Sequence, residues 1–241
     1  MNRGLSLNSK ARHASPVRGH QRAKRAQRTS SFRNQIKDLA RDLLIQHGYH
    51  GMSYGDLATA LKGTRANIHY HFGNKQELVE EVLDNYIELT LAQLREVWGS
   101  PGIPLVGKIE RTAEHSRTRY LKYNRSGNTG RPWSLITRMR QDSDALTPHS
   151  REVLLKYGQD LYTIIVSAIE EAKTRGEFVS WMPVEDVALQ LVSIANSGGP
   201  ITQDARNFER LEQLYMSFAR IITLAFGRDR TRISRSRRRR S

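Results

Sequence analysis

The sequence predicts an all-α protein. Apolar residues recur at helical spacing over most of the chain, and helix start and stop signals separate the periodic segments. No stretch alternates between apolar and polar residues for long enough to indicate a strand. With 241 residues, the chain is long enough for one large core or two modest domains.

Composition excludes several classes of protein. The sequence contains no cysteine, which excludes disulfides, thiolate metal sites and a cysteine nucleophile. No apolar run approaches the roughly 20 residues of a membrane-spanning helix, and the N-terminus has no apolar signal-peptide region. We therefore expect a soluble, cytoplasmic protein.

The net charge of +15 is concentrated at the two ends of the sequence. Residues 1–28 hold eight basic and no acidic residues, and residues 228–241 hold eight arginines and one aspartate. Both segments are poor in apolar residues, so they cannot offset the entropy lost on folding. They are predicted to be disordered tails, which would add salt-sensitive, non-specific affinity for nucleic acid.

The first two helices have clear boundaries. A single apolar stripe runs from Phe32 to Leu44 and predicts a helix over residues 29–47, ended by Gly48. Ser53 and Asp56 then form a helix start signal in which the serine side chain accepts a hydrogen bond from an otherwise unpaired backbone amide. The dipeptide at 62–63, Lys-Gly, is predicted to break the second helix because glycine tolerates a positive φ.

The third helix has almost no apolar face. Thr64 is predicted to cap it, and only Ile68 and Phe72 suit a core. Its other residues are small, or polar and planar, which provides donors for base edges and phosphates. Asn74 and Glu77 form a second capping pair that opens a long amphipathic helix over 75–98.

The later helices follow from periodicity and from breaks at Pro and Gly. Segment 100–104, Ser-Pro-Gly-Ile-Pro, is the clearest break in the middle of the chain, and 124–132 is predicted to be a loop. Further helices are predicted over 105–123, 133–139, 148–175, 184–196 and 205–226, with 197–200 as the break before the last.

The run TRANIHYHFGNKQEL, residues 64–78, resembles the recognition helix and following linker of the TetR family of bacterial repressors. The family pattern is Ser/Thr-x-x-x-Leu/Ile-Tyr-x-His/Tyr-Phe-x-x-Lys-x-x-Leu, and the detailed match covers residues 32–82. The sequence departs from it in having Lys-Gly before Thr64 where Gly-Val is frequent, Tyr54-Gly55 at the second helix, and His69 where Tyr is common. The matching positions are Thr64, Ile68, Tyr70 or His71, Phe72, Lys75 and Leu78.

The resemblance implies a TetR-like architecture. A three-helix DNA-binding bundle would span 29–75, with the helix-turn-helix at about 54–73, and a helical effector-binding and dimerisation domain would span 76–227. Base contacts are expected from Arg65, Ala66, Asn67 and His69, and phosphate contacts from Thr64, Tyr70, His71 and Lys75. Ser53 and Tyr54 would add a phosphate contact through helix-end amides.

The family also encloses a ligand cavity among its C-terminal helices. Candidate lining residues combine aromatic walls with polar anchors, although ordinary core or surface placement remains open for each of them. His115 and Arg119, one helical turn apart, suit an acidic ligand. The candidates are Tyr86, Thr90, His115, Arg119, Trp133, Met139 and Tyr162.

A homodimer is expected because one helix-turn-helix unit reads only a few base pairs. Apolar residues spread widely around the last helix, which with the long helix before it would form a four-helix interface between protomers. The alternative is that this helix lies inside one chain. The interface candidates are Leu161, Ile165, Ile169, Leu211, Leu214, Tyr215, Phe218 and Ile222.

Taken together, these features predict a cytoplasmic, nucleoid-associated bacterial repressor. It would bind a near-palindromic double-stranded operator as a homodimer and be released by a small-molecule effector. One alternative is a non-specific nucleic-acid-binding protein that acts through its basic tails; another is a helical enzyme, although no catalytic motif is present. No cofactor is expected, and no metal site, because His69 and His71 are two apart and would point to different faces of a helix.

Overall fold

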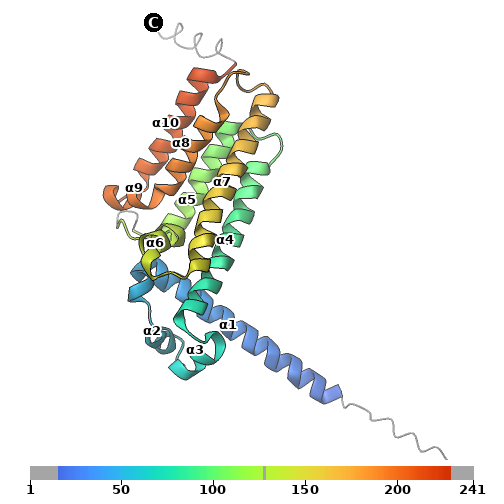
Figure 1. The fold of residues 1–241 in the computed structure, drawn as a ribbon, viewed down its shortest axis with the longest axis vertical. Coiled ribbons are helices and arrows are strands. Elements are labelled where there is room, and N and C mark those ends of the chain that lie inside the picture. Colours follow the sequence, from blue (N-terminus) through green and yellow to red (C-terminus); the bar gives the residue numbers. More distant parts are fainter. Residues whose placement is uncertain (1–15, 127–128, 229–241) are drawn as a thin grey trace, which may run out of the picture.

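The computed structural model describes residues 16–126 and 129–228, with side chains from Thr29 onward. This part of the chain forms ten α-helices and one 3-10 helix, with a single isolated bridge between Phe178 and Gly227 in place of any strand, which confirms the all-α prediction (Figure 1). The elements are α1 Pro16–Gly51, α2 Tyr54–Ala60, α3 Arg65–Phe72, α4 Lys75–Gly99, α5 Leu105–Tyr123, α6 Leu135–Gln141, η1 Ser143–Ala145, α7 Pro148–Thr174, α8 Val184–Asn196, α9 Gly198–Ala205 and α10 Glu209–Phe226.

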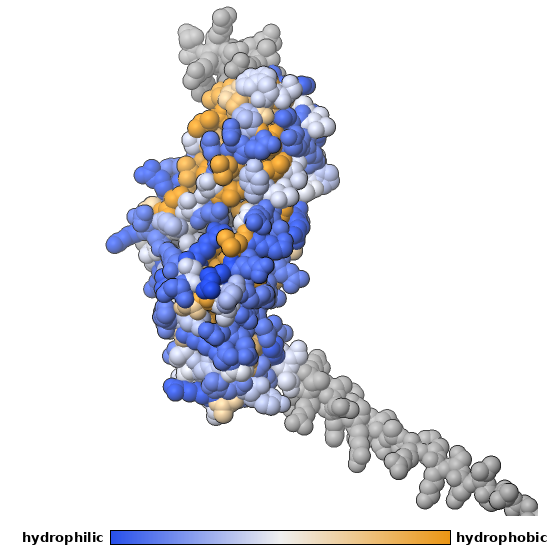
Figure 2. All heavy atoms as spheres, in the orientation of Figure 1, coloured by the Kyte–Doolittle hydropathy of each residue, from blue (hydrophilic) through white to orange (hydrophobic). Residues whose placement is uncertain are grey.

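The helices form an elongated bundle with α2 and α3 at one end (Figure 1). Helices α4, α5, α7, α8 and α10 run along the long axis, and α6 lies between this bundle and α1. The C-terminal end of α10 lies at the pole opposite α2 and α3. Figure 2 shows that hydrophobic residues reach the visible surface mainly in the half of the molecule away from α3, where α8 and α10 face the viewer.

Helix α1 begins much earlier than predicted. Residues 16–28, which were expected to belong to a disordered tail, continue the first helix as far as Pro16, and residues 1–15 lie outside the described residues. Proline suits the first position of a helix, and Ala, Gln, Lys and Arg all have high helix propensity. The prediction of disorder rested on the low apolar content of this segment. Apolar residues are needed for packing, whereas this part of α1 extends away from the rest of the molecule (Figure 1).

Two glycines act differently from one another. Gly48 has φ 74° and interrupts the helical conformation of α1, as predicted. Gly198, by contrast, was predicted to lie in a break but is the first residue of α9, so the final helix begins at Glu209. A Cβ at Gly198 would lie 3.1 Å from Leu211 and 3.4 Å from Trp133. This glycine therefore allows close packing of α9 and does not interrupt the helical structure.

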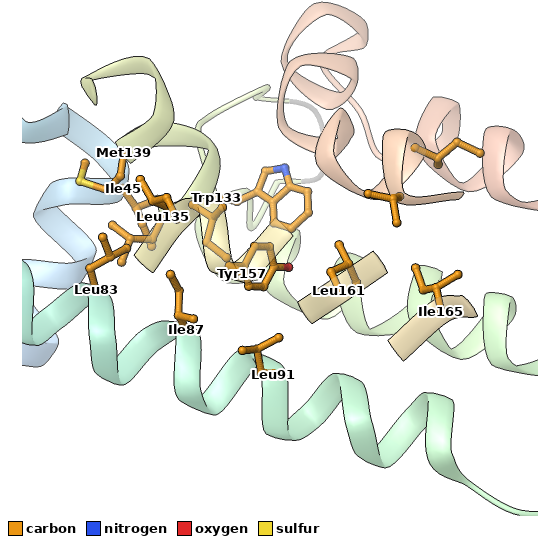
Figure 3. Close-up of a cluster of buried hydrophobic side chains, with 14 of the residues drawn as sticks. Ile45, Leu83, Ile87, Leu91, Trp133, Leu135, Met139, Tyr157, Leu161 and Ile165 are labelled. Atoms are coloured by element: carbon orange, nitrogen blue, oxygen red, sulfur yellow. The ribbon is translucent and has the colours of Figure 1, made fainter. Parts of the chain in front are cut away.

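The hydrophobic core is continuous from one end of the molecule to the other. Helix α4 contributes to all of it, because Leu78 to Leu83 pack with α1–α3 while Ile87 and Leu91 face α6 and α7. Figure 3 shows Ile45 of α1 next to Leu135 and Met139 of α6 at the junction. A shift of α4 or α6 would therefore change the packing of the N-terminal bundle.

The far end of α4 is fixed by a buried lysine. Lys108 of α5 is fully buried, and its Nζ donates to the carbonyl of Trp98 at 2.6 Å and pairs with Glu171 of α7 at 3.1 Å. The ammonium group thus satisfies one of the free carbonyls at the C-terminus of α4. Within the described residues, no helix is both long and apolar enough to cross a membrane.

Candidate nucleic-acid interface and internal cavity

Local capping fixes the geometry of α2 and α3. The Ser53 hydroxyl accepts from the Asp56 amide at 3.2 Å, and the Asp56 carboxylate accepts from the Ser53 amide at 3.1 Å, which completes the predicted capping box. Thr64 caps α3 through the Asn67 amide at 3.2 Å. These short-range bonds fix where the two helices begin, and buried residues of both helices hold them on the core.

The turn between α2 and α3 differs from its prediction in one detail. Lys62 has φ 51°, whereas Gly63, which was expected to tolerate the positive φ, does not adopt one. Gly63 instead donates its amide to the Ala58 carbonyl at 2.8 Å, and a Cβ there would meet only Phe32 at 3.9 Å. The conformational strain of this turn is therefore carried by a lysine.

Helix α3 presents a polar face to solvent. Only Ile68 and Phe72 are buried, and they hold the helix on the core. Tyr70 is 82% exposed, which is unusual for an aromatic side chain. The other exposed residues of the predicted site are Ser53, Thr64, Arg65, Ala66, Asn67 and His69.

The remaining predicted residues have partners within the chain. Tyr54 is buried, with its ring 4.7 Å from that of His69, and burial raises its pKa to about 12. His69 Nδ1 lies 2.6 Å from the Gly73 carbonyl, while the His71 ring packs at 5.4 Å from Phe32. The two histidines thus contact different parts of the domain.

Lys75 begins α4 and is half-buried. Its Nζ lies 4.4 Å from the centre of the Tyr49 ring, and burial lowers its pKa. Beside it, Arg33 of α1 stacks on Phe72 at 4.3 Å and pairs with Glu81 of α4. These contacts fasten α3 between α1 and α4, so the exposed face of α3 is rigidly positioned.

An internal cavity of about 80 Å³ lies among α4, α5, α6, α7, α8 and α10. Four of the seven predicted effector residues line it: Thr90, His115, Arg119 and Trp133. The other three do not. Met139 is fully buried in the junction with α1, Tyr86 lies outside the cavity and accepts a hydrogen bond from Arg119, and Tyr162 packs on a different side of α7.

The cavity contains residues that the sequence reasoning missed. Tyr157, Leu161 and Ile165 form its α7 wall at helical spacing, and Tyr162 is one residue out of phase with them. Arg140 of α6 donates Nη1 to the Asn196 side chain at 2.9 Å and lies 5.9 Å from the centre of the Tyr157 ring. Arg140 lies near the C-terminal end of α6 and reaches the cavity through the packing of α6 on α7 and α8, which the sequence does not indicate.

The predicted dimer residues are mostly wrong. Seven of the eight are buried inside the chain, with exposures of 6% or less: Leu161, Ile165, Ile169, Leu211, Tyr215, Phe218 and Ile222. Only Leu214 is exposed, at 38%. Helix α10 carries two apolar stripes, and the prediction selected the one that packs on α5, α8 and α9.

Comparison with known proteins agrees with this geometry. Residues 36–82, which comprise the capped α2–α3 unit and its flanking helices, match the family model of "Bacterial regulatory proteins, tetR family". This N-terminal region of the chain, residues 36–82, is of the TetR family. The TetR match points to a transcriptional regulator that binds DNA.

Solved structures share the TetR fold over nearly their whole length. Reduced NemR of E. coli has 15% identity and a TM-score of 0.66, covering 77% of this chain and 94% of its own. A TetR regulator from Legionella pneumophila has 20% identity and a TM-score of 0.64, covering 78% and 95%. A Saccharomonospora viridis regulator in complex with choline has 20% identity and a TM-score of 0.67, covering 82% and 98%. No match to a curated protein was found.

Proposed function

We propose that this TetR-family protein is a homodimeric repressor that binds a near-palindromic operator and is released by a small-molecule effector. The exposed polar face of α3 carries the proposal, because a helix with only Ile68 and Phe72 buried leaves its other side chains free for a partner. Arg65, Ala66 and Asn67 lie in its first turn, where base contacts of a recognition helix concentrate.

Dimerisation is proposed through the second apolar stripe of α10. Leu214, Ile221 and Leu224 follow one face of this helix with exposures of 38%, 60% and 56%. Trp181, 67% exposed, packs edge-to-face against Phe226 at the end of the same helix, and Leu189 of α8 is exposed too. An apolar surface of this kind favours a symmetric interface with a second copy, formed by α8 and α10.

The cavity is proposed as the effector site. Helix α4 reaches from α3 to the cavity wall, where it contributes Thr90, Gln93 and Trp98. Helix α6 forms another wall and contacts α1 through Asp142. A ligand that repositions either helix alters the spacing of the two α3 helices in the dimer. A 100-fold change in DNA affinity requires about 2.7 kcal/mol of coupling, which is ordinary for allosteric proteins.

The test is selection of sequences from random duplex DNA at about 0.15 M salt, with the full chain and a truncated chain of residues 29–227. Enrichment of one palindromic site by both supports the proposal. The competing function, non-specific binding through the basic ends of the sequence, predicts that nothing is enriched and that binding is lost on truncation. Asn67→Ala separates the two further, because it weakens operator binding and leaves end-driven binding unchanged.

A further inference from the structure

We propose that the internal cavity binds a small organic carboxylate with an apolar body, whose negative charge is held between Arg119 and Arg140. This inference rests on the proposed role of the cavity as the effector site. The described residues that line the cavity include two arginines and one histidine, but no aspartate or glutamate. Its wall is therefore positively charged.

Neither arginine is neutralised within the described part of the chain. Arg119 donates to the Tyr86 hydroxyl and lies 5.4 and 5.6 Å from the ring centres of Tyr86 and Trp133. Arg140 contacts only the neutral groups of Asn196 and Tyr157.

Five other arginines of the described chain have a carboxylate partner within the protein. These pairs are Arg33–Glu81, Arg41–Asp38, Arg117–Glu212, Arg138–Asp142 and Arg175–Glu171. The two cavity arginines have no such partner although both are partly buried against the cavity, and a ligand anion would supply the missing counter-charge.

Both positive charges lie on the cavity that Tyr157 lines, and Arg140 is 5.9 Å from the centre of its ring. Burial raises the pKa of Tyr157, and the charges of Arg119 and Arg140 act in the opposite direction. Burial also lowers the pKa of Arg140, as expected for a cation removed from water without a counter-charge. A carboxylate placed beside Tyr157 would meet both arginines and relieve that cost.

The rest of the cavity suits an apolar body. Trp133, Tyr157, Leu161 and Ile165 lie along one side of it, and Figure 3 shows the rings of Trp133 and Tyr157 next to each other. At the α4 wall, the Trp98 Nε1–H is buried and donates to no protein atom of the described residues, so it is a further donor for a ligand oxygen. The volume of about 80 Å³ favours a small molecule.

A cationic ligand does not fit this wall. One structure of the same fold holds choline, a quaternary ammonium ion. A cavity that lacks carboxylates and contains Arg119 and Arg140 would repel such a cation, although its aromatic rings alone would attract one. Choline is therefore an informative negative probe.

The experiment compares ligands of equal shape and different charge, using the full chain without DNA. The pairs are benzoate with benzamide and hexanoate with hexanamide, and choline is the cation. We expect at least one carboxylate at millimolar concentration to raise the melting temperature by several degrees, because a ligand that binds only the folded state stabilises it. The matched amide and choline should produce no comparable shift.

Substitutions then test whether Arg119 and Arg140 hold the ligand carboxylate. Arg119→Gln and Arg140→Gln should each raise the dissociation constant of the active carboxylate, measured by calorimetry, by about 10- to 100-fold. Arg111→Gln is the matched control, because Arg111 is exposed on the same helix as Arg119 and does not line the cavity. It should leave binding unchanged.

The proposal is wrong if neither carboxylate shifts the melting temperature, or if an amide or choline shifts it as much. It is also wrong if both cavity variants bind like the wild type. Should a variant fail to fold, the carboxylate–amide comparison on the wild-type chain still decides the matter. No readout involves DNA, so failure here is distinguishable from failure of the proposed operator binding.

Discussion

The side-chain carboxylate of Asp142 accepts a hydrogen bond from the backbone N–H of Tyr49 at 2.7 Å. Asp142 ends α6, a wall of the cavity, and Tyr49 follows the break in α1 at Gly48. Arg138 Nε lies 3.8 Å from the same carboxylate. This contact joins the cavity to the N-terminal bundle independently of α4.

Gly48→Ala should destabilise the protein by about 2 kcal/mol. The residue has φ 74°, and a Cβ there would lie 2.5 Å from Asp142 Oδ2 and 2.7 Å from Arg138. Urea unfolding measures the change in the free energy of unfolding. Gly99→Ala is the control, since a Cβ there meets nothing within 4 Å, and an equal loss in both variants would refute the argument.

Asp142→Ala should reduce the effect of a bound ligand on DNA affinity more than it reduces DNA affinity itself. Removing a charged acceptor costs about 1.5–3 kcal/mol of folding free energy and leaves only the apolar contacts between α6 and α1. DNA titrations with and without ligand measure the coupling. Unchanged coupling in a folded variant would show that this hydrogen bond does not transmit the signal.

Asn67→Ala should weaken operator binding by about 1–3 kcal/mol and relax sequence preference at one position of each half-site. Asn67 is exposed in the first turn of α3, and only its backbone amide is used, in the cap with Thr64. Fluorescence anisotropy with the selected operator is the measurement. Gln76→Ala, at an exposed position in the first turn of α4, is the control and should bind normally.

Ile221→Glu should convert the dimer to a monomer and remove high-affinity operator binding. The side chain is 60% exposed in the outer stripe of α10, so a carboxylate is tolerated in the monomer but would be buried without a partner in the interface. Light scattering after gel filtration gives the mass. Leu155→Glu, at a 71% exposed position on α7, is the control; a loss of dimer there would place the interface elsewhere.

Stability should contain a small pH-dependent contribution from His149 and Asp84, which link α7 to α4. The hydrogen bond to Asp84, with Nε2 at 3.1 Å from both carboxylate oxygens, raises the pKa of His149 above 6.5. The folded state therefore binds the proton more tightly, so the contribution is complete below about pH 6.5 and is lost as the pH rises through the folded-state pKa.

Both side chains are half exposed, which limits this contribution to under about 1 kcal/mol. The free energy of unfolding measured at pH 5.5 and pH 8 should differ less in His149→Gln than in the wild type. Asp84→Asn should have the same effect, and the double variant no additional one. Fully additive effects would contradict a direct pair.

Features that depend on neighbouring residues were predictable from the sequence. The caps at Ser53, Thr64 and Asn74 are made by side chains three residues from the amides that they satisfy, so the letters alone indicate them. The bounds of α5 and α8 were predicted to the residue for the same reason, because Pro and Gly flank their apolar periods.

Features that depend on tertiary packing were predicted only in part. Periodicity finds an apolar stripe, but α10 has two, and the sequence does not say which of Leu211 and Leu214 faces inward. Similarly, Arg119 was predicted at the cavity whereas Arg140 was not, since their proximity to Tyr157 arises from helices far apart in the chain.

The N-terminal end of α1 and the C-terminal end of α10 lie at opposite poles of the described molecule (Figure 1). Helix α1 extends outward from the bundle that holds α3, while Arg228 is tied to the Glu177 carbonyl at 3.1 Å at the other pole (Figure 1). A duplex seated on α3 therefore has the N-terminal end as its neighbour and the whole length of the 25-residue α4, about 37 Å, between it and Arg228. Arg228 is thus too far from α3 to contact a duplex bound there.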